Sequence, residues 1–166
     1  TLRTKGDRGE AMKVMCLGAE AVTVALHAEG RFDAVLGLGG SGGASVIAPA
    51  MRALPIGLPK VLVSTVASGN TAPYVGLADI TMIPSVVDVA GVNRISETIY
   101  SAAAGAVCGM VETEYAAAGS SKPIIAASMF GQTTPCVTRC RDMLAADGYE
   151  VLVFHATGTG GRTMEG

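Results

Sequence analysis

The sequence predicts an α/β fold: a three-layer, doubly wound, mostly parallel sheet of about five strands with Rossmann-like connections. Five short apolar runs, each as long as a buried strand, recur along the 166 residues. Helical patterns separate most of these runs, which indicates crossover connections and parallel neighbours. Hydrophobic residues make up 49% of the chain and charged residues 16%, as expected for strands covered on both faces. The same composition excludes a disordered tail.

The first predicted element is an amphipathic helix from about Asp7 to Glu29. Apolar residues recur there at spacings of three and four, and Gly30 supplies the stop. These residues are Met12, Met15, Ala19, Val22 and Leu26. We expect residues 1–31 to lead in from a preceding lobe, and residues 32–166 to form one Rossmann-like nucleotide-binding lobe of a longer chain.

Strands and helices alternate through that lobe. Predicted strands end at or directly before glycine, serine, threonine, proline or histidine residues, and helix-length segments follow most of them. The strands are expected at 33–40, 60–65, 79–84, 123–128 and 149–154, and the helices at 41–54, 93–118 and 135–147. The longest of these helices contains Ala102 to Gly109, a run with little side-chain bulk that permits close packing against a neighbour.

The net charge and the cysteines limit the classes of partner and the cellular compartment that we expect. The net charge of −2 and the lack of a Lys/Arg cluster argue against nucleic acid or a membrane surface as a partner. The longest apolar runs are too short to span a bilayer. The four cysteines form no CxxC pair and no secretory signal is evident, so we expect a reduced, cytoplasmic protein.

The predicted carboxyl ends of the strands carry glycine and hydroxyl residues, which is where open parallel sheets bind ligands. Glycines let backbone N–H groups curve around an anion, and a following helix N-terminus adds partial positive charge. A phosphate, carried by a nucleotide such as ATP or by another phosphorylated small molecule, is the ligand that this pattern favours. The candidate binding residues are Gly39, Gly40, Ser41, Gly42, Gly43, Thr65, Ser68, Gly69, Asn70, Thr71, Gly131, Thr133, Thr134, Gly158, Gly160, Gly161 and Arg162.

Two common nucleotide motifs fit poorly. Gly37, Gly39 and Gly42 satisfy GxGxxG between a strand and a helix, but the second strand ends in Ser64-Thr65 rather than the acid that holds a dinucleotide ribose. A Walker loop is excluded because no Gly-Lys-Ser/Thr follows the glycines.

Four side chains near these loops are candidates for more specific roles. Arg162 follows two glycines and suits a charge-assisted phosphate contact, or it is a solvated surface arginine. Asp88 suits a phosphate-bound Mg²⁺ or caps a helix. His155 is a general base, a hydrogen-bond partner of the ligand, or a core histidine. Cys136 is expected in the first turn of a helix capped by Thr133 or Thr134, where the helix dipole favours a nucleophilic thiolate.

Several strings of the sequence resemble one known family. They are Gly39–Gly43, Leu54–Lys60, Ser64–Gly69, Pro84–Asp88, Met129–Gly131, Thr133–Cys136, Phe154–Gly158 and Gly160–Arg162. From about Phe32 onward the chain resembles the amino-terminal ATP-binding region of the tomato mosaic virus resistance protein and its bacterial relatives. The resemblance implies an ATP-binding module of two Rossmann-like lobes, this chain being similar to the second, with flanking domains of the same chain as partners.

Three functions therefore stay open. The first is an ATP-binding module, with Mg²⁺ as a possible companion. The second is a thiol-dependent isomerase or lyase that uses Cys136. The third is a structural unit that forms a homo-oligomer through the helix containing Gly105.

Overall fold

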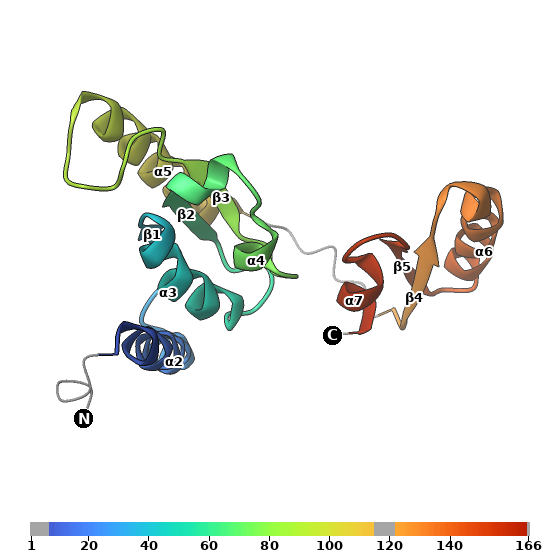
Figure 1. Cartoon of the computed structure of the whole chain (residues 1–166). Coiled ribbons are helices and arrows are strands. Elements are labelled where there is room, and N and C mark those ends of the chain that lie inside the picture. Colours follow the sequence, from blue (N-terminus) through green and yellow to red (C-terminus); the bar gives the residue numbers. More distant parts are fainter. Residues whose placement is uncertain (1–6, 115–121, 166) are drawn as a thin grey trace. The chain divides into compact units, whose positions relative to one another are not determined.

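The computed structural model describes residues 7–114 and 122–165, which belong to two compact units, 1–114 and 115–166. Unit 1 opens with α2 (Arg8–Ala28) and continues through β1 (Val35–Leu38), α3 (Ser41–Arg52), β2 (Lys60–Ser64), the 3₁₀ helix η1 (Thr65–Ser68), α4 (Ala72–Val75), β3 (Thr81–Pro84) and α5 (Arg94–Glu112) (Figure 1). Its three strands form one parallel sheet in the order β1-β2-β3.

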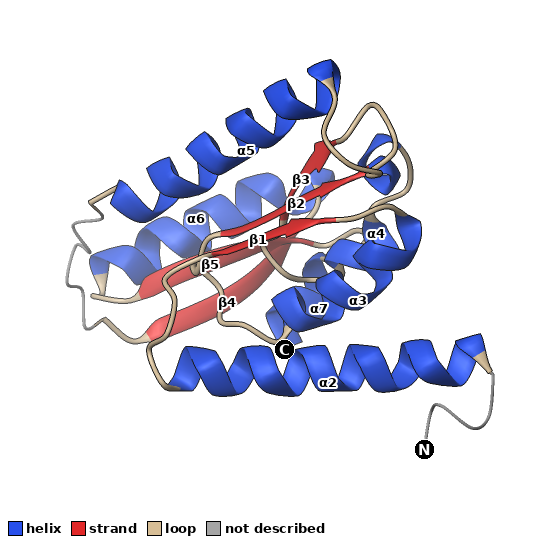
Figure 2. Cartoon of the chain, turned by 90° about the vertical axis from the view of Figure 1, so that its left-hand side faces the viewer, coloured by secondary structure: helices blue, strands red, loops and turns tan. Residues whose placement is uncertain are grey.

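Helices cover both faces of this sheet. Leu62 of β2 packs with Ala48 and Met51 of α3 on one face, whereas Val61 and Val63 pack with α5 on the other. Figure 2 shows α5 on one side of the strands and α3 with α4 on the opposite side. All five residues of β2 are buried, as expected for the central strand of a parallel sheet.

Unit 2 contains β4 (Ile124–Met129), η2 (Gly131–Thr133), α6 (Thr134–Ala146), β5 (Glu150–His155) and α7 (Gly160–Glu165). β4 and β5 form a parallel two-stranded sheet whose register runs from Ile124 opposite Glu150 to Met129 opposite His155. Both α6 and α7 contact these strands.

The α/β class and the parallel pairing are confirmed, and every predicted strand and long helix is present within a few residues of its expected bounds. The arrangement differs from the expected single five-stranded sheet in one lobe, because the described residues form a three-stranded and a two-stranded sheet in separate units. An alternation of strand and helix predicts crossovers, but it does not state which strands share a sheet. The helix expected at 93–118 ends at Glu112, and residues 115–118 lie outside the described part.

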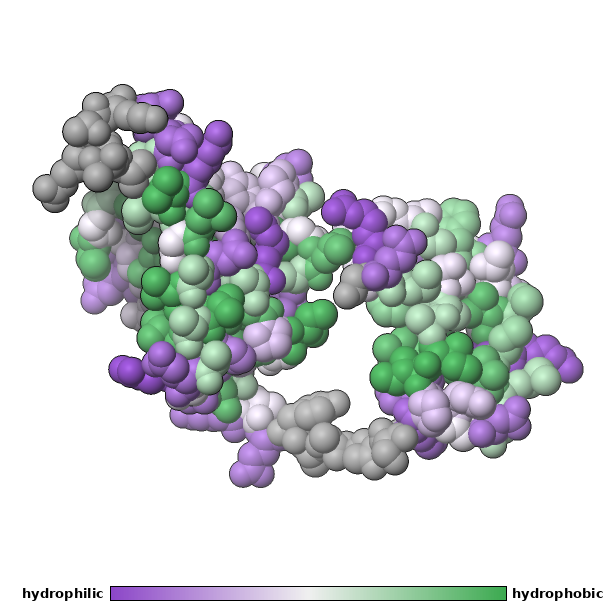
Figure 3. All heavy atoms as spheres, turned by 90° about the horizontal axis from the view of Figure 1, so that it is seen from below, coloured by the Kyte–Doolittle hydropathy of each residue, from purple (hydrophilic) through white to green (hydrophobic). Residues whose placement is uncertain are grey.

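The packed face of α2 differs from the predicted one. Leu26, Ala19 and Met12 are half-buried as expected, but Met15 and Val22 are 56% and 58% exposed. Cys16 takes part in the contact instead, since its thiol donates to Ser45 O of α3 at 3.2 Å. α2 is apolar on more than one side, so the three-to-four spacing fits two overlapping faces. Hydrophobic residues consequently reach the surface (Figure 3).

The helix α2 also bears on the expectation that no segment can span a bilayer. By length and composition it is long and apolar enough to do so, although charged residues interrupt it. The expectation considered only continuous apolar runs, and it therefore overlooked a helix that contains a few charged residues. In the structure one side of α2 packs against α3.

At the amino end of β2 lies a buried ion pair. The ammonium of Lys60 is fully buried and donates to Pro55 O at 2.8 Å, to Leu58 O at 2.9 Å and to Asp79 Oδ1 at 2.6 Å. The second carboxylate oxygen, Asp79 Oδ2, accepts the Gly57 N–H at 2.7 Å. All three ammonium protons therefore have partners, which is the condition for burying a lysine.

We expect this pair to make the stability of unit 1 sensitive to acid. Burial raises the pKa of Asp79, but hydrogen bonds from Lys60 and Gly57 and the lysine charge outweigh burial and lower it below 3.8. A depressed folded-state pKa adds stability that is present above about pH 4 and is lost as the pH falls through the folded value. Urea unfolding from pH 6 to pH 2 measures this loss. Asp79→Asn should flatten the profile, whereas Glu10→Gln, at an exposed carboxylate, should leave its shape unchanged.

Candidate functional site

Three predicted loops of unit 1 meet at the carboxyl edge of its sheet. Backbone hydrogen bonds between neighbouring strands continue to the ends of the strands. The Gly39 N–H donates to Val63 O at 3.0 Å, and the Ser85 N–H donates to Ser64 O at 3.2 Å. A Cβ placed on Gly40 would lie 3.5 Å from Asp88 Oδ1 and 3.9 Å from Thr65 Oγ1. Gly40, Thr65 and Asp88, one from each loop, are thus brought together as predicted for parallel strands.

The first loop delivers an uncapped helix N-terminus. Gly40 is the N-cap of α3, and no side chain accepts a hydrogen bond from the first turn. Gly39 has to be glycine, because a Cβ there would lie 2.9 Å from Gly43 Cα. A Cβ on Gly42 or Gly43 would meet nothing within 4 Å. The first amides of α3 therefore lack a capping side chain, and open space lies beside two of its glycines.

The third loop contains a strained turn that sequence reasoning missed. Val86 has φ +63°, and the turn is closed by the Val87 N–H donating to Ser85 O at 2.7 Å. The hydroxyl of Ser85, fully buried, donates to Val87 O at 2.7 Å. A three-residue turn with positive φ at a β-branched residue is rare and costs energy. It directs the chain so that Asp88 reaches Gly40. Nothing in the sequence signals it, because valine is disfavoured there.

In the second loop, most of the predicted binding residues form the loop's own turns. Ser68 lies in η1, and Gly69 closes that turn through a bond from its N–H to Val66 O at 3.1 Å. The side chain of Asn70 accepts the Ala72 N–H at 3.1 Å. The Thr71 carbonyl accepts from Tyr74 and Val75 in α4. Of the predicted residues in this loop, Thr65 is the one near Gly40.

Unit 2 carries its own two loops at the carboxyl ends of β4 and β5. In the first, which contains Gly131 and Thr134, Thr133 Oγ1 bonds to the backbone of Phe130, so Thr133 does not cap α6. In the second, a Cβ on Gly160 would collide with the His155 carbonyl, so a glycine is required there. Gly158 has φ +72°, whereas nothing crowds Gly161. Arg162 is exposed on α7, with no hydrogen bond or ion pair among the described residues.

The interpretation of His155 as a core histidine is wrong. It is exposed at the last position of β5, and its ring lies 6.2 Å from that of Phe130 with the planes tilted by 56°. The strand pattern predicted burial, but a two-stranded sheet leaves its last side chain uncovered.

Cys136 lies in the first turn of α6 and is exposed, as predicted. The helix begins at Thr134 rather than at Pro135, and neither threonine caps it through its side chain. Cys140 is also exposed, one turn further along the helix. No hydrogen bond joins either thiol to a base within the described residues, so a nucleophilic role stays a prediction.

A metal would find few protein ligands here. Across residues 7–114 and 122–165 no group of three His, Cys, Asp or Glu side chains is placed to hold an ion. Asp88 Oδ1 accepts the Val89 N–H at 2.8 Å and faces Gly40. A single carboxylate fits Mg²⁺ only when phosphate oxygens and water supply the other ligands. Asp88 is therefore compatible with a nucleotide-bound Mg²⁺ and not with a resident metal centre.

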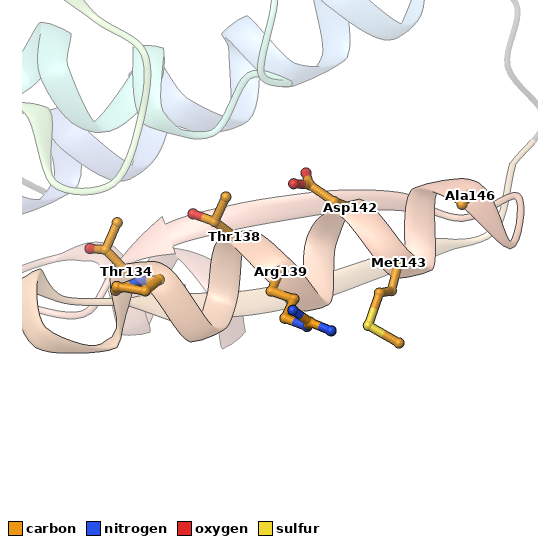
Figure 4. A pocket seen from close by; sticks show the side chains of 7 residues that line it. Thr134, Thr138, Arg139, Asp142, Met143 and Ala146 are labelled. Atoms are coloured by element: carbon orange, nitrogen blue, oxygen red, sulfur yellow. The ribbon is translucent and has the colours of Figure 1, made fainter.

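A surface groove on unit 2 runs along α6. Its lining residues come from α6 alone, and Figure 4 shows Thr134, Thr138 and Asp142 on one side of the helix with Arg139 and Met143 directed elsewhere. Of the predicted binding residues, Thr134 alone contributes to it. An open groove along one helix does not enclose a small molecule, so the glycine edge of unit 1 is the better candidate.

Comparison with known proteins gives the family. Residues 1–116 match the model described as "Uncharacterised protein family (UPF0261) N-terminal domain", and residues 122–166 match that of its C-terminal domain. The first of these matches ends within two residues of the boundary between units 1 and 2.

Bacterial and plant relatives agree. A UPF0261 protein of Clostridium tetani is 53% identical over 97% of this chain and 40% of its own length. One of Mesorhizobium japonicum is 51% identical over 96% of this chain and 39% of its own length. The ToMV resistance protein Tm-1(GCR237) of Solanum lycopersicum is 44% identical over 99% of this chain and 23% of its own length. The chain thus spans about two fifths of the bacterial relatives and less of the tomato protein. On these matches, the chain belongs to the UPF0261 family and is a homologue of the tomato Tm-1 proteins.

Proposed function

We propose that the carboxyl edge of the β1-β2-β3 sheet binds the phosphate groups of a nucleotide, with ATP as the first ligand to test. The observation that carries the proposal is the uncapped N-terminus of α3, which opens directly after a strand through a loop in which Gly39 is sterically required. Such an N-terminus offers backbone donors and partial positive charge to an anion. We place the unit in the doubly wound, Rossmann-like class on the same grounds.

Thr65 and Asp88 extend this proposal. A hydroxyl beside Gly40 supplies a further donor to a phosphate oxygen, whereas a carboxylate beside it repels a bare phosphate. A Mg²⁺ carried by the nucleotide would remove that repulsion, with Asp88 as its one protein ligand. We therefore expect the site to favour Mg²⁺-bound ATP over inorganic phosphate. We further propose that the protein acts in the cytoplasm, as part of a longer chain.

The substitution Gly42→Ala separates a binding role from a structural one. A Cβ at Gly42 meets nothing within 4 Å, and alanine favours a helix over glycine, so thermal stability should stay the same or rise. The added methyl group would crowd a phosphate held against the first turn of α3. We expect affinity for ATP with Mg²⁺, measured by calorimetry on the full-length protein, to fall about tenfold, which corresponds to about 1.4 kcal/mol.

Gly18→Ala is the matched control, because Gly18 also lies in a helix with open space around it but far along the chain in α2. It should leave ATP affinity unchanged. The proposal fails if the parent protein gives no binding heat at millimolar ATP with Mg²⁺. A destabilised Gly42→Ala variant would instead assign this glycine to packing.

A further inference from the structure

Three sulfur-containing side chains share one face of α6 in unit 2. Cys136, Cys140 and Met143 occupy positions i, i+4 and i+7 of this helix. Because an α-helix completes a turn about every 3.6 residues, these positions fall within about 60° of one another around the helix axis. They lie on successive turns, and we call the three residues the sulfur face.

The sulfur face is exposed within the described part of unit 2. Both thiols are exposed and free of disulfides, and Met143 is 60% exposed. Neither thiol has a hydrogen-bond partner among residues 122–165. The helix packs on its strands through another side, where Val137 and Leu144 are half-buried. The packing of these described residues therefore does not account for three sulfur atoms on one face.

The spacing of the two thiols suits a bridging metal ion better than a disulfide. Side chains at i and i+4 of a helix have Cβ atoms about 5–6 Å apart, whereas a disulfide holds its Cβ atoms about 3.5–4.5 Å apart. A metal with metal–sulfur bonds of about 2.3 Å bridges sulfur atoms up to about 4.6 Å apart. Rotation about χ1 brings thiols at this spacing to such a separation, so an ion can link Cys136 and Cys140 without unwinding the helix.

The donor set selects a soft monovalent cation. Thiolate and thioether sulfurs are soft ligands and favour Cu(I), whereas carboxylates, carbonyls and water favour Mg²⁺. Structural Zn²⁺ almost always has four ligands, but no group of three His, Cys, Asp or Glu side chains is placed to hold an ion in residues 7–114 and 122–165. Two thiolates and one thioether fit the two- or three-coordinate geometry of Cu(I).

We propose that the sulfur face binds one Cu(I) ion through the thiolates of Cys136 and Cys140, with the Met143 thioether as a third ligand. Each thiol releases its proton as its copper–sulfur bond forms, and the thioether adds a lone pair, so the bound centre carries one net negative charge. Arg139 extends from the same side of α6 as Met143 (Figure 4). Its charge and the positive amino end of the helix offset the charge of the centre. The site is independent of the phosphate site proposed for unit 1.

Competition for Cu(I) tests the proposal with the reduced, full-length protein in the absence of oxygen. In a titration against the coloured Cu(I) complex of bicinchoninate, the parent should withdraw Cu(I) from the chelator. Cys136→Ser and Cys140→Ser should each weaken this binding by at least about a hundredfold, the upper end of the loss when a metal site loses an outer-shell partner. Met143→Leu keeps an apolar side chain of similar size and should weaken it about tenfold.

Cys108→Ser and Met110→Leu are matched controls, because both residues are exposed on α5 of unit 1. They should leave the affinity for Cu(I) unchanged, and circular dichroism checks that every variant keeps the fold. The proposal is overturned if the parent leaves Cu(I) with bicinchoninate, or if Cys108→Ser loses as much affinity as Cys136→Ser. An unchanged affinity in Met143→Leu would overturn the role of the thioether.

Discussion

Replacing Asp79 by asparagine should lower the free energy of unfolding by about 2–3 kcal/mol at neutral pH, because it leaves the Lys60 ammonium buried without its counter-charge. Removing one partner of a fully buried pair costs roughly 3–5 kcal/mol; the Asp79 side chain is 39% exposed, so solvent already screens part of the attraction. Urea unfolding followed by circular dichroism measures the difference.

A double-mutant cycle separates the ion pair from simple packing. Lys60→Met alone should also destabilise, since Asp79 and two carbonyl oxygens lose their donor. The double variant should lose at least about 1 kcal/mol less than the sum of the single losses. Strict additivity would show that the two charges do not interact. Glu10→Gln, which removes an exposed carboxylate 3.9 Å from Lys13, is the control and should cost less than about 0.5 kcal/mol.

The second large effect is expected at Arg162 of unit 2, which tests a phosphate contact at the turn after β5, separate from the unit 1 site proposed above. If its guanidinium binds a phosphate through two hydrogen bonds, Arg162→Ala should weaken ATP binding by about 1.5–3 kcal/mol, roughly ten- to a hundredfold. The fold should remain intact, because Arg162 is exposed and holds no described neighbour. Lysine should restore only part of the affinity, since it keeps the charge but loses the paired donors.

The affinity series also tells which phosphate is involved. Calorimetry on the full-length protein should show a larger loss for ATP than for AMP if Arg162 meets the terminal phosphates. Arg141, exposed and paired with Asp142 on α6, offers a matched Arg→Ala control whose ATP affinity should not change. If Arg162→Ala binds ATP as tightly as the parent, the role assigned to this arginine is wrong.

Local sequence patterns predicted the elements well and their assembly less well. β2 was recognisable because Lys60 to Ser64 is a short apolar run between turn residues, and α3 because it follows a glycine loop. Those are properties of adjacent residues. The division into two sheets depends on which strands pair, a long-range property that strand patterns do not encode.

The candidate site shows the same limit. Gly40, Thr65 and Asp88 were predicted to share an edge because parallel strands end together, and the structure brings these three side by side. The Val86 turn escaped prediction because a β-branched residue argues against positive φ. Lys60 escaped as well. A lysine at a strand start is ordinarily a surface residue, and its partner Asp79 lies 19 positions away without a pattern that connects them.

The buried ion pair also constrains how this sequence can drift. A lineage that loses Lys60 or Asp79 first must pass through an unpaired intermediate, which is the costly state, whereas loss of both is milder. Substitutions at the two positions are therefore epistatic, and homologous chains should keep both residues or replace both. The Lys60 ammonium also donates to the Pro55 and Leu58 carbonyls. Loss of Lys60 would therefore also remove two hydrogen bonds that hold the turn before β2.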